Sequence, residues 1–263
     1  MASLLRVAFG LLLCLPLAAR AADGDAVKTD VATVSARAGV VQRFLLLTPP
    51  GPVTARVILF AGGDGHIGIG EDGQLARGGN FLVRTRAAWA RQGFLVAVVD
   101  TPSDRDGMDA FRDSDEHAAD IAAVAEFMRQ RSPAPLWLVG TSRGTTSAAA
   151  VGIRLADRVA GLVLTSSIMQ GRGRVGALDL ARFAHPVLLI HHRADSCRVT
   201  PPSGVDALLR GFSAAPVRAG LLEEGGVSRG DACEAFAYHG YNGIEERVVQ
   251  DAADWIRAPR ALP

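Results

Sequence analysis

The clearest candidate for chemistry in this chain is Ser142, the central residue of Gly140-Thr141-Ser142-Arg143-Gly144. An apolar run precedes this G-x-S-x-G pattern and a line of small residues follows it, an order typical of a buried strand, a sharp turn and a helix. Glycine at both ends removes side chains that would crowd the neighbouring strand or helix. The Ser142 hydroxyl would be exposed at the turn, and the amide of Arg143 at the helix N-terminus would face an oxyanion formed there. The pattern therefore predicts a nucleophile elbow.

A second match to the same pattern surrounds Ser228, and a chain with 29 glycines can contain such a match by chance. The segment before Ser228 is Glu223-Glu224-Gly225, which is not a strand pattern, and no line of small residues follows it. We therefore interpret Ser228 as a polar loop residue and Ser142 as the candidate nucleophile.

A serine nucleophile needs a general base, and the base needs an acid that fixes its tautomer. Groups at the carboxyl ends of parallel strands meet at one rim of a sheet, so the partners should follow later strands. Asp195 comes just after the apolar run 186–191 and is the preferred acid. An aspartate on a surface loop is the alternative interpretation. Weaker candidates for the acid, each on or near an expected helix or turn, are Asp179, Asp206 and Glu224.

The preferred base is His239, which follows the last expected strand and precedes the last expected helix. Gly240 and Gly243 would allow this loop to place the imidazole over the rim of the sheet. The other histidines lie in a glycine-rich loop, on a helix, or beside a strand, where they more plausibly have structural roles; they are His66, His117, His185, His191 and His192.

Strands and helices are expected to alternate along the chain, which favours a mostly parallel sheet with helices on both faces. Continuous apolar runs predict strands buried on both sides. The expected strands are 31–35, 40–48, 56–61, 94–99, the elbow strand, 159–165, 186–191 and 218–222, the first two forming an antiparallel edge. The expected helices are 80–92, 113–131, the helix after the elbow to about 155, 205–212 and 244–256.

Length and composition suit a well-cored α/β protein, since 49% of the 263 residues are hydrophobic and 21% are charged. Arg6, an apolar run over 7–17 and an Ala-x-Ala site ending at Ala21 predict a secretory signal peptide over residues 1–22. Residues 23–263 would then be a single domain, with two small domains and an uncleaved anchor as alternatives. Cleavage removes Arg6 and Arg20, so the mature chain would have 26 basic and 27 acidic residues and a net charge of −1. That balance favours neither nucleic acid nor an anionic membrane as partner.

Two cysteines remain after the predicted cleavage, Cys197 and Cys233. In the periplasm or outside the cell such a pair is more often a disulfide than two free thiols. The bridge would contribute about 3–4 kcal/mol in the chain-entropy model. Two thiols without matched histidines make a poor metal site. The bridge would connect the loop of Asp195 with the loop of His239.

The order Ser142, Asp195, His239 and the setting of the elbow resemble the α/β-hydrolase superfamily over essentially all of the predicted mature chain. The resemblance implies an eight-stranded, mostly parallel sheet with helices on both faces. It also implies that Ser142 is the nucleophile, that His239 acts as general base and then acid, and that Asp195 orients His239.

Members of this superfamily carry a second oxyanion donor just after the third strand, commonly in a His-Gly-x segment. Here that place is Ala61-Gly62-Gly63-Asp64, which lacks the histidine. The amide of Gly63 is the first candidate for this donor and that of Asp64 the second, beside the amide of Arg143. A flexible surface loop is the alternative interpretation of residues 62–70. A phosphate-binding loop is excluded because no G-K-[ST] follows.

Many members of the superfamily insert a lid between the sixth strand and the acid-bearing strand. The interval 166–184 has room for only a short helix, so we expect no large lid and a shallow, open pocket. Its walls would be 63–70, 105–111, 166–174 and 238–242. Arg143 and Arg172 would attract an acidic substrate, although exposed arginines more often only interact with solvent at the protein surface.

The expected protein is a periplasmic or secreted serine hydrolase that cleaves carboxylic esters through an acyl-enzyme. The expected substrate is a small or soluble ester, and the triad needs no metal or organic cofactor. A hydrolase of small peptides or amides with the same triad is one alternative. A non-catalytic binding protein on the same scaffold is the other.

Overall fold

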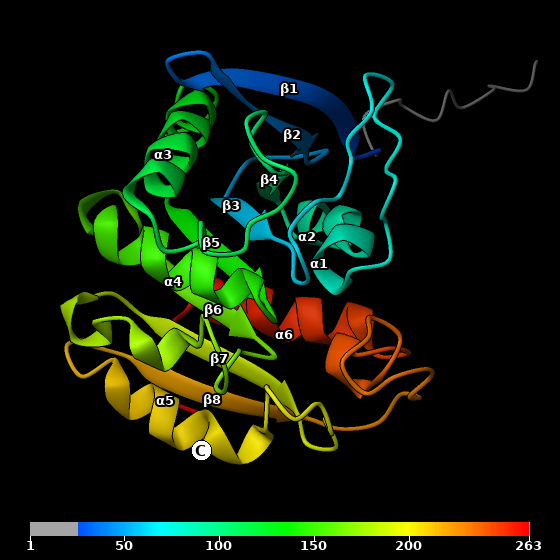
Figure 1. Ribbon diagram of the computed structural model, residues 1–263, viewed down its shortest axis with the longest axis vertical. Helices are drawn as coiled ribbons and strands as arrows, with labels where there is room; N and C mark the ends of the chain where they lie inside the picture. Colours follow the sequence, from blue (N-terminus) through cyan, green and yellow to red (C-terminus); the bar gives the residue numbers. More distant parts are fainter. Residues whose placement is uncertain (1–25, 263) are drawn as a thin grey trace, which may run out of the picture.

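The computed structural model describes residues 26–262, which build one eight-stranded sheet with helices on both faces (Figure 1). The strand order is β1-β2-β4-β3-β5-β6-β7-β8. The strands are β1 (Lys28–Arg37), β2 (Val40–Thr48), β3 (Ala55–Phe60), β4 (Phe94–Val99), β5 (Leu136–Thr141), β6 (Gly161–Thr165), β7 (Val187–His192) and β8 (Arg218–Glu223). The helices are α1 (Phe81–Arg84), α2 (Arg86–Arg91), α3 (Asp115–Arg129), α4 (Gly144–Arg154), α5 (Val205–Gly211) and α6 (Glu245–Arg257).

The pairing of the strands confirms the expected fold class. β1 pairs with β2, and β2 with β4, in antiparallel fashion, which makes the antiparallel edge. The other neighbouring strands of the described sheet run parallel. Every residue of β3 to β7 is buried, which explains why these strands are continuous apolar runs rather than alternating ones.

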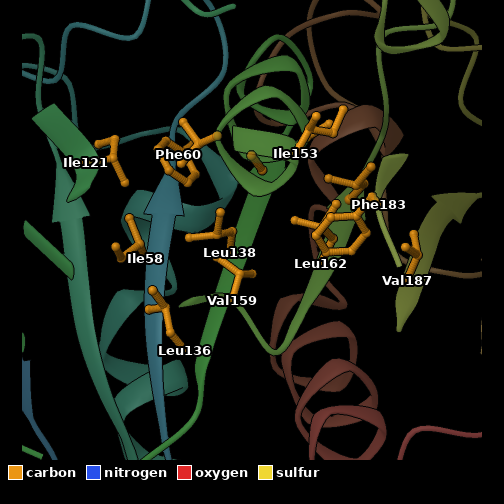
Figure 2. Packing of buried hydrophobic residues seen from close by; sticks show 14 of the residues in the cluster. Ile58, Phe60, Ile121, Leu136, Leu138, Ile153, Val159, Leu162, Phe183 and Val187 are labelled. Carbon is orange, nitrogen blue, oxygen red and sulfur yellow. The ribbon is translucent and has the colours of Figure 1, made fainter. Parts of the chain in front are cut away.

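Two hydrophobic clusters lie on opposite faces of this sheet. On one face Ile58, Leu138 and Leu162 belong to a cluster that includes residues of α3, α4 and α5. Figure 2 labels them together with Ile121 of α3 and Ile153 of α4. On the other face the strands pack against α1, α2 and α6, with Trp89 and Trp255 buried there. With both faces covered, the carboxyl ends of the parallel strands are the edge where loops can gather functional side chains.

Two expected helices differ from those in the structure. The helix expected over 80–92 is two short helices, α1 and α2, which meet at Thr85. The Thr85 hydroxyl donates to the Phe81 carbonyl at 2.7 Å, so at the break this side chain competes with backbone amides for a helix carbonyl. The helix expected over 113–131 is shorter at both ends and runs from Asp115 to Arg129. Ser114 caps its start by accepting from the amide of His117.

The interval between β6 and the strand that precedes Asp195 contains two short 3₁₀ turns, Val175–Ala177 and Leu180–Arg182, in agreement with the expected lack of a large lid. The signal peptide predicted over 1–22 lies outside the described residues. Across residues 26–262 no helix has the length and apolar character needed to cross a membrane.

Candidate active site

Ser142 occupies the turn between the end of β5 and the start of α4, as the pattern predicts. Its φ is +52°, in the left-handed region, which costs a residue other than glycine about 1–2 kcal/mol. Two hydrogen bonds hold this conformation. The Ser142 amide donates to the carbonyl of Thr165 on β6 at 3.0 Å, and the Ser142 carbonyl accepts from the amide of Thr145 at 2.9 Å. The side chain is only half-buried, so its hydroxyl is accessible.

The glycines of the elbow are required by close backbone contacts. A Cβ at Gly140 would overlap the carbonyl of Gly144, and a Cβ at Gly144 would overlap the carbonyl of Phe60 on β3. A Cβ at Gly62 would lie 2.9 Å from the Cβ of Ser142, so the loop after β3 passes directly beside Ser142. The Ser228 segment, in contrast, is an exposed loop.

The structure brings His239 and Asp195 together. His239 Nδ1 lies 3.0 Å from Asp195 Oδ2, and both side chains are at least nine-tenths buried. Because the Asp195 carboxylate only accepts hydrogen bonds, Nδ1 of His239 carries the imidazole proton and Nε2 is the basic nitrogen. Between residues 26 and 262 no hydrogen bond joins the Ser142 hydroxyl to His239, although both line the same hollow. Bonds of this kind often shorten only when substrate is bound.

Asp195 is itself held by its own loop. Oδ1 accepts from the amide of Cys197 at 2.9 Å, and Oδ2 accepts from the hydroxyl of Thr200 at 2.9 Å. The Thr200 hydroxyl is also 3.1 Å from His239 Nδ1, so it contacts both members of the pair. These bonds fix the carboxylate in the plane needed to orient the imidazole.

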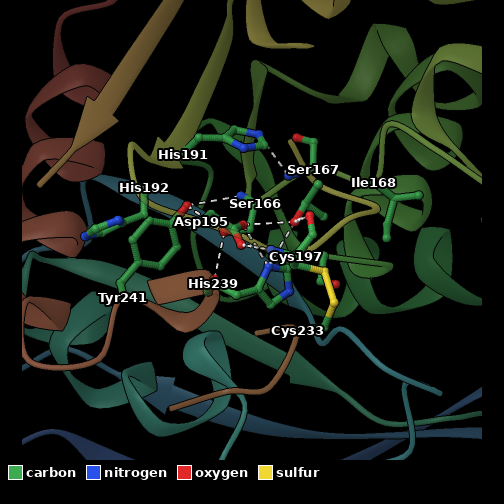
Figure 3. Close-up of polar contacts among 12 residues, drawn as sticks. Ser166, Ser167, Ile168, His191, His192, Asp195, Cys197, Cys233, His239 and Tyr241 are labelled. Atoms are coloured by element: carbon green, nitrogen blue, oxygen red, sulfur yellow. Dashed lines mark hydrogen bonds and ion pairs between the residues drawn. A yellow bond between two sulfur atoms is a disulfide. The ribbon is translucent and has the colours of Figure 1, made fainter. Parts of the chain in front are cut away.

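A network of buried hydroxyls anchors the loop of His239 (Figure 3). The Ser166 hydroxyl donates to the His239 carbonyl at 2.8 Å and lies 3.0 Å from the Tyr241 hydroxyl. The Tyr241 hydroxyl donates to the Ile190 carbonyl at 2.7 Å and accepts from the Ser166 amide at 3.0 Å. Burial raises the pKa of Tyr241, which keeps the phenol neutral. Both Ser166 (φ +44°) and Tyr241 (φ +59°) are left-handed, so backbone strain concentrates around the site.

The disulfide between Cys197 and Cys233 spans 36 positions and links the two loops (Figure 3). Cys197 is buried and lies two residues after Asp195, whereas Cys233 is exposed and lies six residues before His239. The bridge therefore fixes the acid loop against the base loop.

The loop after β3 carries the candidate oxyanion donors and is well anchored. The Asp100 carboxylate accepts from the amides of Ile67 (2.9 Å) and Ile69 (2.8 Å). In the described part of the chain, the amides of Gly63, Asp64 and Arg143 donate to no protein acceptor. These amides are thus free to bind a negative oxygen at the elbow.

A hollow of about 490 Å³ surrounds Ser142 and His239. Its walls come from the loop after β3, the residues before α1 and the 233–240 segment. Phe236, 49% exposed, stands at its mouth with the guanidinium of Arg84 over its ring. The predicted walls at 105–111 and 166–174 instead contribute to a second hollow of about 470 Å³ beside Arg143, where Arg143 pairs with Asp109 at 3.0 Å. A larger hollow of about 580 Å³ lies over α5, and neither Ser142, Asp195 nor His239 lines it.

Of the remaining histidines in the described part of the chain, only His66 lines the hollow of Ser142. His191 Nε2 accepts from the amide of Ser167 at 2.9 Å, and burial lowers its pKa to about 4. His192 Nε2 lies 2.8 Å from the Gly225 carbonyl, and His117 is buried on α3. His66 lines the hollow beside Ser142, with its Nδ1 3.0 Å from the Thr101 hydroxyl.

The weaker acid candidates do not reach the imidazole of His239. Asp206 lies on α5, Asp179 precedes a 3₁₀ turn, and the exposed Glu224 pairs with Arg193. Within residues 26–262 no group of three or more His, Cys, Asp or Glu side chains is arranged to hold a metal ion.

Comparison with solved structures identifies the fold. A serine hydrolase homologue from Coxiella burnetii is 16% identical, with a TM-score of 0.61 over 86% of this chain and 96% of that one. Est1E from Butyrivibrio proteoclasticus is 14% identical, with a TM-score of 0.59 over 86% and 97%. A serine hydrolase without a lid from Xanthomonas campestris is 17% identical, with a TM-score of 0.58 over 86% and 95%. This chain therefore has the α/β-hydrolase fold. No protein-family model and no curated protein matches its sequence.

Sequence reasoning missed several residues that form hydrogen bonds around the candidate site: Thr200, Ser166, and Tyr241 as a hydrogen-bonding group. A usable signal existed only for Ser166, because it directly follows a predicted strand that ends at the active rim. The others act through contacts between distant segments, which no local spacing encodes.

Proposed function

We propose that this protein is a serine hydrolase that cleaves carboxylic esters through an acyl-enzyme on Ser142. The observation that carries the proposal is the grouping of Ser142, the His239–Asp195 pair and unpaired backbone amides around one open hollow. The likeness to solved serine hydrolases and esterases supports the same reaction class.

In the first half of the proposed reaction, His239 Nε2 takes the Ser142 hydroxyl proton as Oγ attacks the ester carbonyl carbon. The amide of Arg143 and that of Gly63 or Asp64 stabilise the oxyanion, and Asp195 stabilises the imidazolium. His239 then gives the proton to the departing alcohol. In the second half, His239 takes a proton from water as the water attacks the acyl-enzyme, and it gives that proton to Ser142 Oγ as the bond between the acyl carbon and Oγ breaks. The acid product then leaves.

The lack of a large lid and the mixed lining of the hollow favour soluble esters over long acyl chains. Asp64, His66 and Arg77 supply polar groups on one wall, and Phe236 supplies an apolar surface at the mouth. The pairing of Arg143 with Asp109 weakens the argument that Arg143 attracts an acidic substrate.

The direct test is labelling of the purified mature protein with a fluorophosphonate probe, beside Ser142→Ala and Ser228→Ala variants. We expect labelling of the wild type and of Ser228→Ala, and none of Ser142→Ala. A matched panel of esters and amides then separates esterase from amidase activity. If the wild type does not react, the hydrolase proposal is wrong and a binding role on this scaffold becomes the better explanation.

We also propose that the protein works in the periplasm or outside the cell after removal of residues 1–22. The disulfide supports this location, since such bridges persist in oxidising compartments. N-terminal sequencing of the exported protein should begin at Asp23. An intact N-terminus in the cytoplasmic fraction would contradict the proposal.

A further inference from the structure

Arg112 is a buried cation without a carboxylate partner. It is 7% exposed, and burial lowers its pKa to about 10. Nη1 donates to the Ser147 hydroxyl at 3.0 Å, Nη2 donates to the Gly63 carbonyl at 3.1 Å, and Nε has no partner. Among the described residues, no carboxylate forms an ion pair with it. Burying an unpaired charge costs free energy, and here only two neutral oxygens accept hydrogen bonds from the buried guanidinium.

The Gly63 carbonyl belongs to a tight turn beside the nucleophile. The amide of Gly65 donates to the Gly62 carbonyl at 3.1 Å, which closes a β-turn with Gly63 and Asp64 at its centre. Gly63 has φ +59°, and Asp64 is not among the residues with positive φ, as in a type II′ turn.

Rotation of the central peptide would convert this turn to type I′ without moving its ends. Gly63 keeps its positive φ in both forms, and Asp64 is a residue type that tolerates a positive φ. The rotation would exchange the directions of the Gly63 carbonyl and the Asp64 amide. The Arg112 hydrogen bond to the Gly63 carbonyl opposes that rotation.

The segment that carries Arg112 holds the next carbonyl of the turn as well. The amide of Met108 donates to the Asp64 carbonyl at 2.7 Å. A Cβ at Gly65 would lie 2.9 Å from Arg112 Nη2 and would overlap the Met108 side chain, so the turn packs closely on this segment. The three carbonyls of Gly62, Gly63 and Asp64 therefore each accept a hydrogen bond.

The other end of the guanidinium reaches the helix of the nucleophile. Ser147 lies on α4, one turn after Arg143, whose amide is the other candidate donor. The planar guanidinium of Arg112 therefore bridges two segments. One is the turn that carries the Gly63 and Asp64 amides, and the other is the helix that follows the Arg143 amide. The fixed fork of donors of the guanidinium suits such a bridge better than the single ammonium of lysine.

We propose that Arg112 is a positioning residue that holds the two sides of the oxyanion hole in register and keeps the Gly63–Asp64 peptide in one orientation. This inference rests on the proposed hydrolase function. Arg112 does not touch the substrate in this arrangement and acts through the amides that do.

The test compares Arg112→Met and Arg112→Lys with Arg210→Met, which removes an exposed arginine on α5, in hydrolysis of p-nitrophenyl acetate. We expect kcat of the Arg112 variants to fall about 10- to 100-fold with KM changed less than about threefold. Affinity for phenylboronic acid, which forms a tetrahedral adduct on the serine, should fall in parallel. Arg210→Met should equal the wild type.

Two further arms separate positioning from folding. Ethylguanidinium should restore part of the kcat of Arg112→Ala but not that of Ser142→Ala. Ser147→Ala keeps the guanidinium and removes one anchor, so a smaller loss of kcat is expected even if Arg112→Met does not fold. A folded Arg112→Met or Ser147→Ala with wild-type kcat and boronate affinity overturns the inference. If wild type fails to react with the fluorophosphonate, the proposed function itself is wrong and this inference falls with it.

Discussion

The disulfide between Cys197 and Cys233 gives the sharpest separation of stability from activity. Cys233→Ser removes the bridge at its exposed end. The buried Cys197 stays in place, and so does the hydrogen bond from its amide to Asp195 Oδ1. The variant therefore frees the His239 loop from the Asp195 loop without substituting His239 or Asp195.

The stability effect follows from the length of the closed loop. With a separation of 36 positions, the chain-entropy model gives about 3.8 kcal/mol for the loss of the bridge. For a domain of this size, about 2–4 °C of Tm is lost per kcal/mol, so we expect a decrease of about 8–15 °C. Urea unfolding should show the same loss of free energy, since the bridge mainly restricts the unfolded chain.

The activity effect should appear well below the new Tm. The His239–Asp195 contact is 3.0 Å, and a displacement of about 1 Å in such a site can cost up to about 100-fold in rate. We expect kcat of folded Cys233→Ser at 25 °C to fall about tenfold or more with an unchanged circular dichroism spectrum. The wild type under mild reductant should behave alike. If kcat declines only together with the folded fraction, the bridge has a structural role alone and the reasoning is refuted.

Two other substitutions test the buried polar groups. Tyr241→Phe removes the hydrogen bonds of the phenol to the Ile190 carbonyl and the Ser166 amide, which still bond to each other at 2.9 Å, so the free energy of unfolding in urea should fall by about 1–2 kcal/mol. An unchanged urea midpoint would contradict that network. His117 has both ring nitrogens buried without partners, and burial lowers its pKa to about 3. The unfolded residue binds a proton near pH 6.5, so the wild type should lose about 1.4 kcal/mol per pH unit from His117 as the pH falls from 6.5 toward 3. His117→Leu should lack this part of the acid sensitivity, and parallel stability–pH curves for the two proteins would show the reasoning to be wrong. Burial raises the pKa of Glu223 to about 6, so its contribution to the free energy of unfolding increases as the pH falls from 6 to 4.5. This contribution is the same in both proteins and cancels in the comparison.

Much of the fold was predictable because its signals are local. Strands buried on both faces require unbroken apolar runs, so β3, β4, β5 and β7 could be placed within a residue or two. The elbow was predictable because Gly140 and Gly144 are needed wherever a strand turns directly into a helix against a neighbouring strand. The break at Thr85 was missed, since helical spacing continues through it while the threonine hydroxyl bonds the backbone.

The sequence by itself determined the kind of fold and the position of Ser142, because apolar period and glycine spacing are properties of short segments. The order of strands then directed attention to Asp195 and His239 at the same rim. Only the tertiary structure decided what holds them there: Thr200 bonds the Asp195–His239 pair, and Ser166 and Tyr241 bond the loop of His239 and its neighbours. It also decided that Arg112 donates to the Gly63 carbonyl in the loop after β3. These are single hydrogen bonds between segments far apart in the chain. Their partners are fixed by packing of the whole sheet, and no periodicity in the sequence records them.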